Sequence, residues 1–170
     1  MTTDADRTDL EELADLRAAY ARLAPRIVAG EPWPLAADYG NGPESAWGPR
    51  EVLAHLVEML PFWLGELERV IDGDGVTPVP FGRTSDDTTR VALIGRERTL
   101  PLRVLFERID AGFVAWADRL RALSAADLDK VGLHPRDGEI AVASFPARFI
   151  TGHAEGHVAQ MEGILAAVGR

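Results

Sequence analysis

Two histidines near the C-terminus are spaced so that they could bind one metal ion together. His153 and His157 are four residues apart in the run His-Ala-Glu-Gly-His, a spacing that places both on one face of a helix. Neutral imidazoles in this arrangement can chelate a divalent cation. Glu155 is turned about 200° from His153, away from such a site. Two core histidines that merely hydrogen-bond to protein groups would give the same pattern.

A third histidine favours the metal interpretation. His55 belongs to a different periodic segment, with Val52 one turn before it and Met59 one turn after it, so we expect it to face the interior. Three interior histidines from two helices leave a fourth coordination position open, which is typical of catalytic zinc sites. Imidazole also suits nickel, copper and iron, and of these metals we expect zinc or nickel.

Other polar residues could act beside these ligands. Glu58 follows His55 by three residues and could offer a carboxylate to the metal, or it could be an ordinary exposed helix charge. Gln160 follows His157 by three and could hydrogen-bond behind the ligands, or it could simply line a helix interface. His134 lies in a predicted loop and is either a turn residue or a group at a pocket mouth. We take Glu58 and His134 as candidate catalytic residues.

Four segments contain the helical periodicity that must position these side chains. Apolar residues recur at three- and four-residue steps over 13–27, 52–70, 102–123 and 150–168. A capping box at Thr8 and Glu11 predicts the first start, Gly48-Pro49 the second, and Ser144 is a good N-cap for the last. Pro61 should kink or divide the second helix.

The connections between these segments are long. Pro32 to Pro43 is predicted to be a loop containing Gly40, Asn41 and Gly42, and 86–98 could form a short helix. Residues 140–142 could be extended, but so short a piece would not make a sheet. The sequence therefore predicts an all-α fold, a four-helix bundle with long crossover connections, as a single domain over residues 1–170.

Composition excludes several classes of function. The 170 residues include 18 Lys and Arg against 27 Asp and Glu, a net charge of −9, which opposes binding to nucleic acid. The chain has no cysteine, so any thiol that takes part in a reaction must come from outside. No uncharged apolar run approaches the roughly 18 residues of a membrane span, and the N-terminus is not signal-like. We expect a cytoplasmic protein without membrane association.

The sequence resembles the DinB-like superfamily, which includes metal-dependent hydrolases and the bacterial S-transferases that use mycothiol or bacillithiol. Three segments support the resemblance: Trp47-Gly-Pro-Arg-Glu-Val-Leu-Ala-His55-Leu, His134-Pro-Arg-Asp-Gly138, and Phe149-Ile-Thr-Gly-His153-Ala-Glu-Gly-His157-Val-Ala-Gln160. It implies a four-helix bundle with a metal site built by one histidine of the second helix and two of the last. His55, His153 and His157 stand at those positions.

The sequence differs from the family pattern at one position, and the resemblance has further implications. Gly48 stands where the family commonly has Ser or Thr, and some thiol-transferase relatives have Glu at the position of His153, which leaves the branch of the superfamily open. Homodimers are implied as well, and Trp33, Trp116 or Phe145 could supply an interface.

Two functions of different classes follow. The first is an enzyme whose three histidines hold a divalent metal that activates either water, as in a hydrolase, or a low-molecular-weight thiol such as mycothiol, as in an S-transferase. Its substrate would be a small molecule, and Arg83, Arg90 and Arg136 are loop candidates for binding an anionic one. The second is a non-catalytic bundle that binds a small ligand or serves in stress response. A di-iron site would need Glu-x-x-His motifs on two helices, and the sequence has none.

Overall fold

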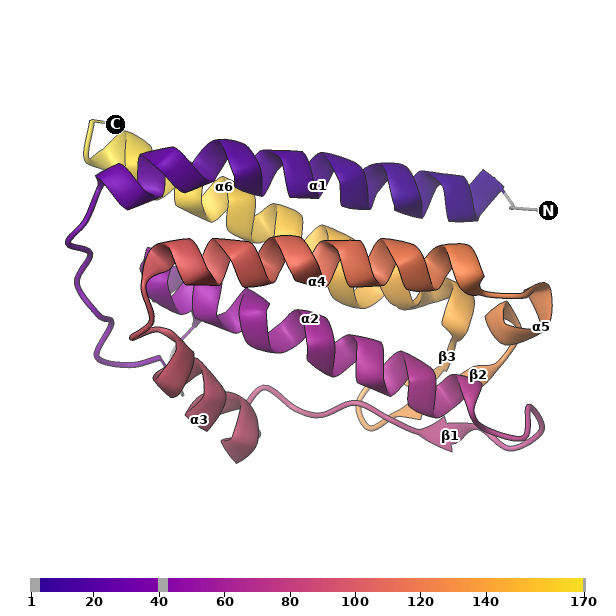
Figure 1. The fold of residues 1–170 in the computed structure, drawn as a ribbon. Helices are drawn as coiled ribbons and strands as arrows, with labels where there is room; N and C mark the ends of the chain where they lie inside the picture. Colours follow the sequence, from indigo (N-terminus) through magenta and orange to yellow (C-terminus); the bar gives the residue numbers. More distant parts are fainter. Residues whose placement is uncertain (1–3, 40–42, 170) are drawn as a thin grey trace.

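Four long helices form the body of the molecule in a computed structural model that describes residues 4–39 and 43–169 (Figure 1). They are α1 (Asp4–Ala29), α2 (Pro49–Ile71), α4 (Leu102–Ala122) and α6 (Gly152–Ala167). The predicted all-α four-helix bundle is therefore confirmed. The turn expected at Gly40, Asn41 and Gly42 lies outside the described residues.

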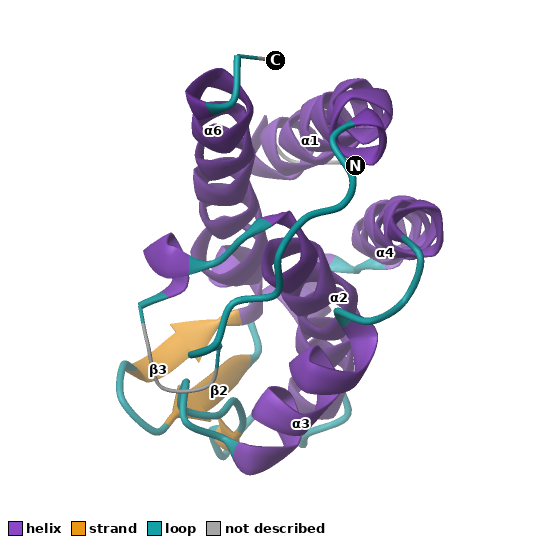
Figure 2. Ribbon diagram, turned by 90° about the vertical axis from the view of Figure 1, so that its left-hand side faces the viewer, coloured by secondary structure: helices purple, strands orange, loops and turns teal. Residues whose placement is uncertain are grey.

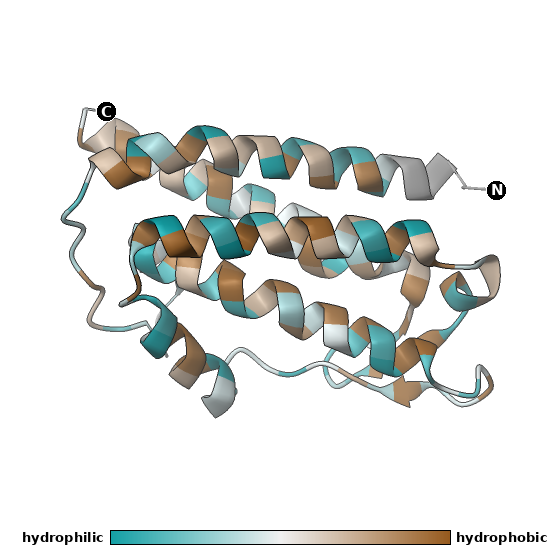
Figure 3. Ribbon diagram, viewed as in Figure 1, coloured by the Kyte–Doolittle hydropathy of each residue, from teal (hydrophilic) through white to brown (hydrophobic). Residues whose placement is uncertain are grey.

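The apolar stripes of these helices meet in one core, because each stripe can leave water only against the others. Figure 3 shows hydrophobic and hydrophilic residues alternating around α1 and α4. The buried stripe of α1 is the predicted one: Leu13, Leu16, Tyr20, Leu23 and Ile27. On α4 it runs through Leu102, Leu105, Phe106, Ile109, Phe113 and Trp116. Trp116 and Phe145 are fully buried, so neither can supply the expected dimer interface.

One helix start differs from expectation, and of the two alternatives for Pro61, a kink or a division, the structure excludes the division. The capping box at Thr8 was wrong, since residues 4–7 continue α1 for another turn. Gly48 and Pro49 do begin α2, yet the helix is not divided at Pro61. Leu60 and Leu67 on either side of this proline are almost completely buried, and their packing holds the helix together across the missing hydrogen bond.

A small sheet lies beside the C-terminal end of α2, away from α1 and α4 (Figure 2). Strand β1 (Val79–Pro80) pairs in parallel with β2 (Val131–His134), which pairs antiparallel with β3 (Gly138–Ala141). The expectation that no sheet forms was wrong, because β2 and β3 close a tight hairpin and β1 joins from far away in sequence. Gly138, with a φ of 76°, allows the hairpin turn.

The chain enters α6 through irregular helix. Val142–Ser144 is a 3₁₀ turn and Pro146–Thr151 a π-helix that leads directly into α6. Ser144 was therefore wrongly expected to cap the last helix, since it lies inside the 3₁₀ turn. The short α3 (Thr88–Glu97) falls within the predicted 86–98, and α5 (Ala125–Leu128) precedes the hairpin. Over the described ranges, no helix is both long and apolar enough to cross a bilayer.

Candidate metal centre

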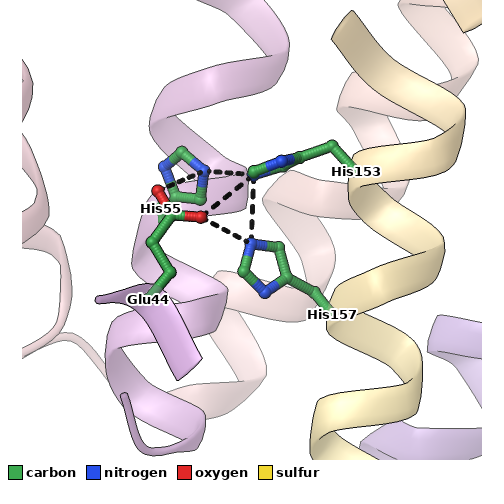
Figure 4. Close-up of side chains that lie close together, drawn as sticks. All are labelled: Glu44, His55, His153 and His157. Atoms are coloured by element: carbon green, nitrogen blue, oxygen red, sulfur yellow. Dashed lines mark hydrogen bonds and ion pairs between the residues drawn. The ribbon is translucent and has the colours of Figure 1, made fainter. Parts of the chain in front are cut away.

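Three histidines and one glutamate converge at the bundle interior (Figure 4). His55 comes from α2, His153 and His157 come from α6, and Glu44 comes from the 3₁₀ turn η1 (Glu44–Ala46). The Nε2 atom of His153 lies 2.8 Å from that of His55 and 3.1 Å from that of His157. The structure thus brings together the three histidines that the sequence singled out.

Glu44 closes the same cluster from the opposite side. Its Oε2 lies 3.5 Å from Nε2 of His153 and 3.6 Å from Nε2 of His157, and its Oε1 lies 3.9 Å from Nε2 of His55. Arg90 forms an ion pair with the same carboxylate. Sequence reasoning missed Glu44 because it lies in a connection without helical periodicity. Its position 11 residues before His55 is the one feature of the sequence that could have suggested it.

Burial keeps the imidazoles in the form that binds metals. Desolvation holds the pKa of His55 well below its usual value, and it also lowers the pKa values of His153 and His157. Burial opposes ionisation of Glu44, but the histidines, when acid protonates them, and the permanent charge of Arg90 outweigh it and lower the pKa of that carboxyl. The site therefore offers neutral imidazole nitrogens and an ionised carboxylate.

Gln160 determines which nitrogen of His157 is free. Its Nε2 donates to the backbone carbonyls of Glu44 (2.8 Å) and Trp47 (3.1 Å), which leaves Oε1 to face His157 Nδ1 at 3.0 Å. Because an amide oxygen only accepts, Nδ1 must hold the proton and Nε2 must offer its lone pair to the cluster. The hydrogen bond that the three-residue spacing suggested is present.

Glu58 lies behind His55 rather than among the ligands. It is buried, so it is not an ordinary surface charge, and its Oε2 lies 3.8 Å from His55 Nδ1. Both of these atoms are without a hydrogen-bond partner within the described part of the chain. Burial raises the pKa of Glu58, while an ion pair with Arg83 opposes this shift. A carboxylate behind a ligating histidine is the usual means of orienting its ring.

The donor set fits a divalent cation. Tetrahedral zinc with bonds of 2.0–2.1 Å separates its nitrogen ligands by about 3.3 Å, slightly more than the 2.8 and 3.1 Å found here. Small side-chain rotations would open the cluster to that size. The four ligand atoms all lie within 4.8 Å of one another. Nitrogen with one carboxylate oxygen suits zinc, nickel or iron.

A cavity of about 420 Å³ opens beside the cluster, and Glu44, His55 and His153 form part of its wall. Met59, Trp63 and Phe149 make an apolar side, with the last two rings stacked at a centroid distance of 4.1 Å. The guanidinium groups that line the cavity come from Arg83, Arg90, Arg136 and Arg148. The first three were named from the sequence, whereas Arg148 was not.

His134 also lines this cavity, outside the cluster of ligands. It ends β2 with its side chain buried, and its Nδ1 lies 3.3 Å from the backbone N and 3.2 Å from Oδ2 of Asp137. Burial lowers the pKa of this imidazole. Of the two interpretations left open by the sequence, the structure supports the pocket residue.

The fold agrees with the comparisons to known proteins. The family model of the DinB superfamily matches residues 3–161, and the chain belongs to that superfamily. A solved structure of YfiT from Bacillus subtilis is similar, with a TM-score of 0.72 and 14% sequence identity over 99% of this chain and 90% of the other. That protein is described as a probable metal-dependent hydrolase with an unusual four-helix bundle topology. No curated protein sequence matches the chain.

Proposed function

We propose that this protein is a metal-dependent hydrolase in which His55, His153 and His157 hold a divalent cation. The observation that supports the proposal most directly is the convergence of three neutral imidazole nitrogens on one point beside a cavity. A cation bound there would supply Lewis acidity, which lowers the pKa of a water molecule or thiol and polarises a carbonyl. The hydrolase described for YfiT is consistent with this chemistry.

Glu44 fills the role of general base. Its ionised carboxylate lies 3.5 Å from Nε2 of His153, next to the three histidines, and the ion pair with Arg90 holds it there. A carboxylate in this place can accept the proton of an attacking water molecule and later return it to the leaving group. Gln160 acts indirectly, by a hydrogen bond that holds the ring of His157 with Nε2 toward the cluster. Glu58 lies 3.8 Å behind His55, so a carboxylate there would stabilise a positive charge that develops on the metal-bound ring.

A thiol-dependent S-transferase is the second candidate. A second cleft also adjoins the cluster, and its lining residues are Glu44, Ser45, Gly152, His153, Gly156, His157 and Gln160. Two openings that share Glu44 and His153 would suit two substrates, a low-molecular-weight thiol such as mycothiol and an electrophile. In that reaction Glu44 would accept the thiol proton instead of the proton of water.

Elemental analysis of protein purified without a metal-binding tag tests the metal site. We expect close to one zinc or nickel per chain, and loss of the metal in H153A/H157A. Glu155→Ala is the matched control, because this residue lies between the two histidines on the exposed side of α6. Equal metal content in H153A/H157A and the control would contradict the site. Absence of metal from the wild type even after zinc and nickel are added would instead favour a non-catalytic ligand-binding bundle.

Glu44→Gln tests the base separately. We expect retained metal with turnover of chromogenic esters lowered about hundredfold or more, while Glu155→Gln leaves both unchanged. Loss of metal from E44Q would make Glu44 a ligand instead of a base.

Activity assays of the wild type distinguish the two reactions. Turnover of a chloronitroarene only when mycothiol is added, with no ester hydrolysis, would favour the transferase over the hydrolase.

A further inference from the structure

Two arginines at the cavity share a single carboxylate. Arg136 Nε lies 3.1 Å from Oδ1 of Asp137, and a guanidinium nitrogen of Arg148 lies 3.4 Å from Oδ2. The side chains of Arg136 and Arg148 are 78% and 49% exposed to solvent. Each guanidinium has five N–H donors, so most of their donors stay available. Two positive charges against one negative charge leave an excess of one positive charge there.

The other two arginines of the cavity are already committed. Arg83 pairs with the buried Glu58, and Arg90 pairs with Glu44 and also donates to the carbonyl of Ser85 at 2.9 Å. The charge of each of these arginines is therefore balanced by a carboxylate that lies in or next to the histidine cluster. The unbalanced charge of the cavity belongs to Arg136 and Arg148.

Two irregular elements bring this pair together. Arg136 and Asp137 lie in the hairpin turn between β2 and β3, and Arg148 lies in the π-helix Pro146–Thr151. Wide π turns inside helices often occur at functional sites. The same π-helix places Phe149 against Trp63, which makes an apolar wall beside the charged pair.

We propose that Arg136 and Arg148 bind the carboxylate of a small organic anion whose apolar body packs against Trp63 and Phe149. A single excess positive charge matches a monoanionic carboxylate, and guanidinium forks bind this planar group in a bidentate manner. The cavity of about 420 Å³ suits a small molecule. This inference rests on the proposed function for the identity of the cavity as the substrate pocket, and it names the class of substrate.

Binding of benzoate to the metal-free full-length protein tests this subsite, with benzyl alcohol and phenyl phosphate as comparison probes. Dissociation constants come from ligand-detected NMR titrations. Removal of the metal prevents the carboxylate from binding to a cation instead. We expect benzyl alcohol to bind about tenfold more weakly than benzoate, and R136Q/R148Q to weaken benzoate binding about tenfold while benzyl alcohol is unaffected. The matched control is R103Q/R121Q, which removes the same charge from exposed positions on α4.

Three results would overturn the proposal: equal benzoate affinity in R136Q/R148Q and R103Q/R121Q, no benzoate binding at millimolar concentrations, or tighter binding of phenyl phosphate than of benzoate. H153A/H157A separates this proposal from the metal site. Benzoate binding that persists in this variant shows that the anion subsite does not depend on the histidines. Loss of metal without loss of benzoate affinity would support both proposals independently.

Discussion

The α1–α4 interface and the α2–α6 interface lie in the same bundle but differ in chemistry. Between α1 and α4 the buried side chains are apolar, and the polar contact that joins Arg17 to Asp110 is half exposed. Between α2 and α6 the buried side chains include His55 and His157, backed by Glu58. Apolar burial stabilises the first interface, whereas desolvated polar groups cost free energy at the second.

The difference separates the part of the bundle that supplies stability from the part that holds the polar cluster. His55 Nδ1 and Glu58 Oε2 are buried 3.8 Å apart without hydrogen-bond partners among the described residues. Such groups persist only when the rest of the fold is stable enough to hold them. Substitutions in the α1–α4 interface should therefore change the free energy of unfolding, and those around α6 should change ligand affinity.

Phe113→Ala should have the largest effect on stability. Phe113 is 1% exposed on α4 and packs against Tyr20 with ring centroids 5.6 Å apart. Loss of a buried phenyl side chain lowers the free energy of unfolding by about 3–5 kcal/mol. Urea denaturation of metal-free protein measures it. Zinc affinity of the folded variant should stay at the wild-type value, and a large loss would contradict the division between the interfaces.

Gln160→Leu should have the converse effect. Without the amide oxygen, His157 loses the acceptor that fixes its Nδ1 proton, so zinc affinity should fall about 10- to 100-fold. Competition titration with a chromogenic chelator measures the affinity, and the unfolding free energy should change much less than in Phe113→Ala. Glu155→Gln on the exposed side of α6 serves as control. Unchanged zinc affinity in Q160L would show that the tautomer needs no such support.

Tyr20→Phe tests the hydrogen bond that joins α1, in the apolar interface, to α6, in the interface that contains the histidines. The Tyr20 hydroxyl of α1 donates to the carbonyl of Ala154 in α6 at 2.9 Å, next to His153, and burial raises the pKa of this hydroxyl. Loss of the hydrogen bond should cost about 1 kcal/mol of unfolding free energy. Zinc affinity should change less than in Q160L. An affinity loss as large as that of Q160L would mean that α1 helps to position the metal ligands.

Arg17→Gln should have the smallest effect, and it should depend on pH. The hydrogen bond from Arg17 lowers the pKa of Asp110 below its usual 3.8. A carboxyl with a lowered pKa in the folded state stabilises above its unfolded pKa and loses this contribution as the pH falls through its folded pKa. Wild type and R17Q should therefore differ slightly at pH 7 and converge below pH 3.8. A difference that grows in acid would contradict this sign.

The sequence predicted the regular parts of the molecule and the histidines of the cluster, which lie on them. The stripe from Leu13 to Ile27 and the pair His153 and His157 follow from helical periodicity, so they could be placed before the structure. The start of the last helix could not be placed, because the 3₁₀ turn that contains Ser144 and the π-helix after it have no recognisable spacing in the sequence. β1 could not either, since its pairing with β2 joins residues more than 50 positions apart.

The residues missed at the site share one property. Glu44 and Arg148 lie in a 3₁₀ turn and a π-helix, where side-chain direction does not follow a fixed period. Their positions come from tertiary contacts, such as the bond between Gln160 and the Glu44 carbonyl. Glu58 was recognised as a candidate, but its burial could not be predicted. Its charge is paired with Arg83, which comes from a loop 25 residues further along the chain.

The π-helix Pro146–Thr151 also sets the register between two parts of the site. It fits one more residue into a turn than an α-helix does. Deletion of a single residue between Arg148 and His153 would change both the number of residues and the rotation per residue that separate them. Such a deletion would leave the three histidines in the chain and change the direction of the Arg148 guanidinium relative to them. The length of this segment therefore sets how the two arginines of the proposed anion subsite face the proposed metal centre.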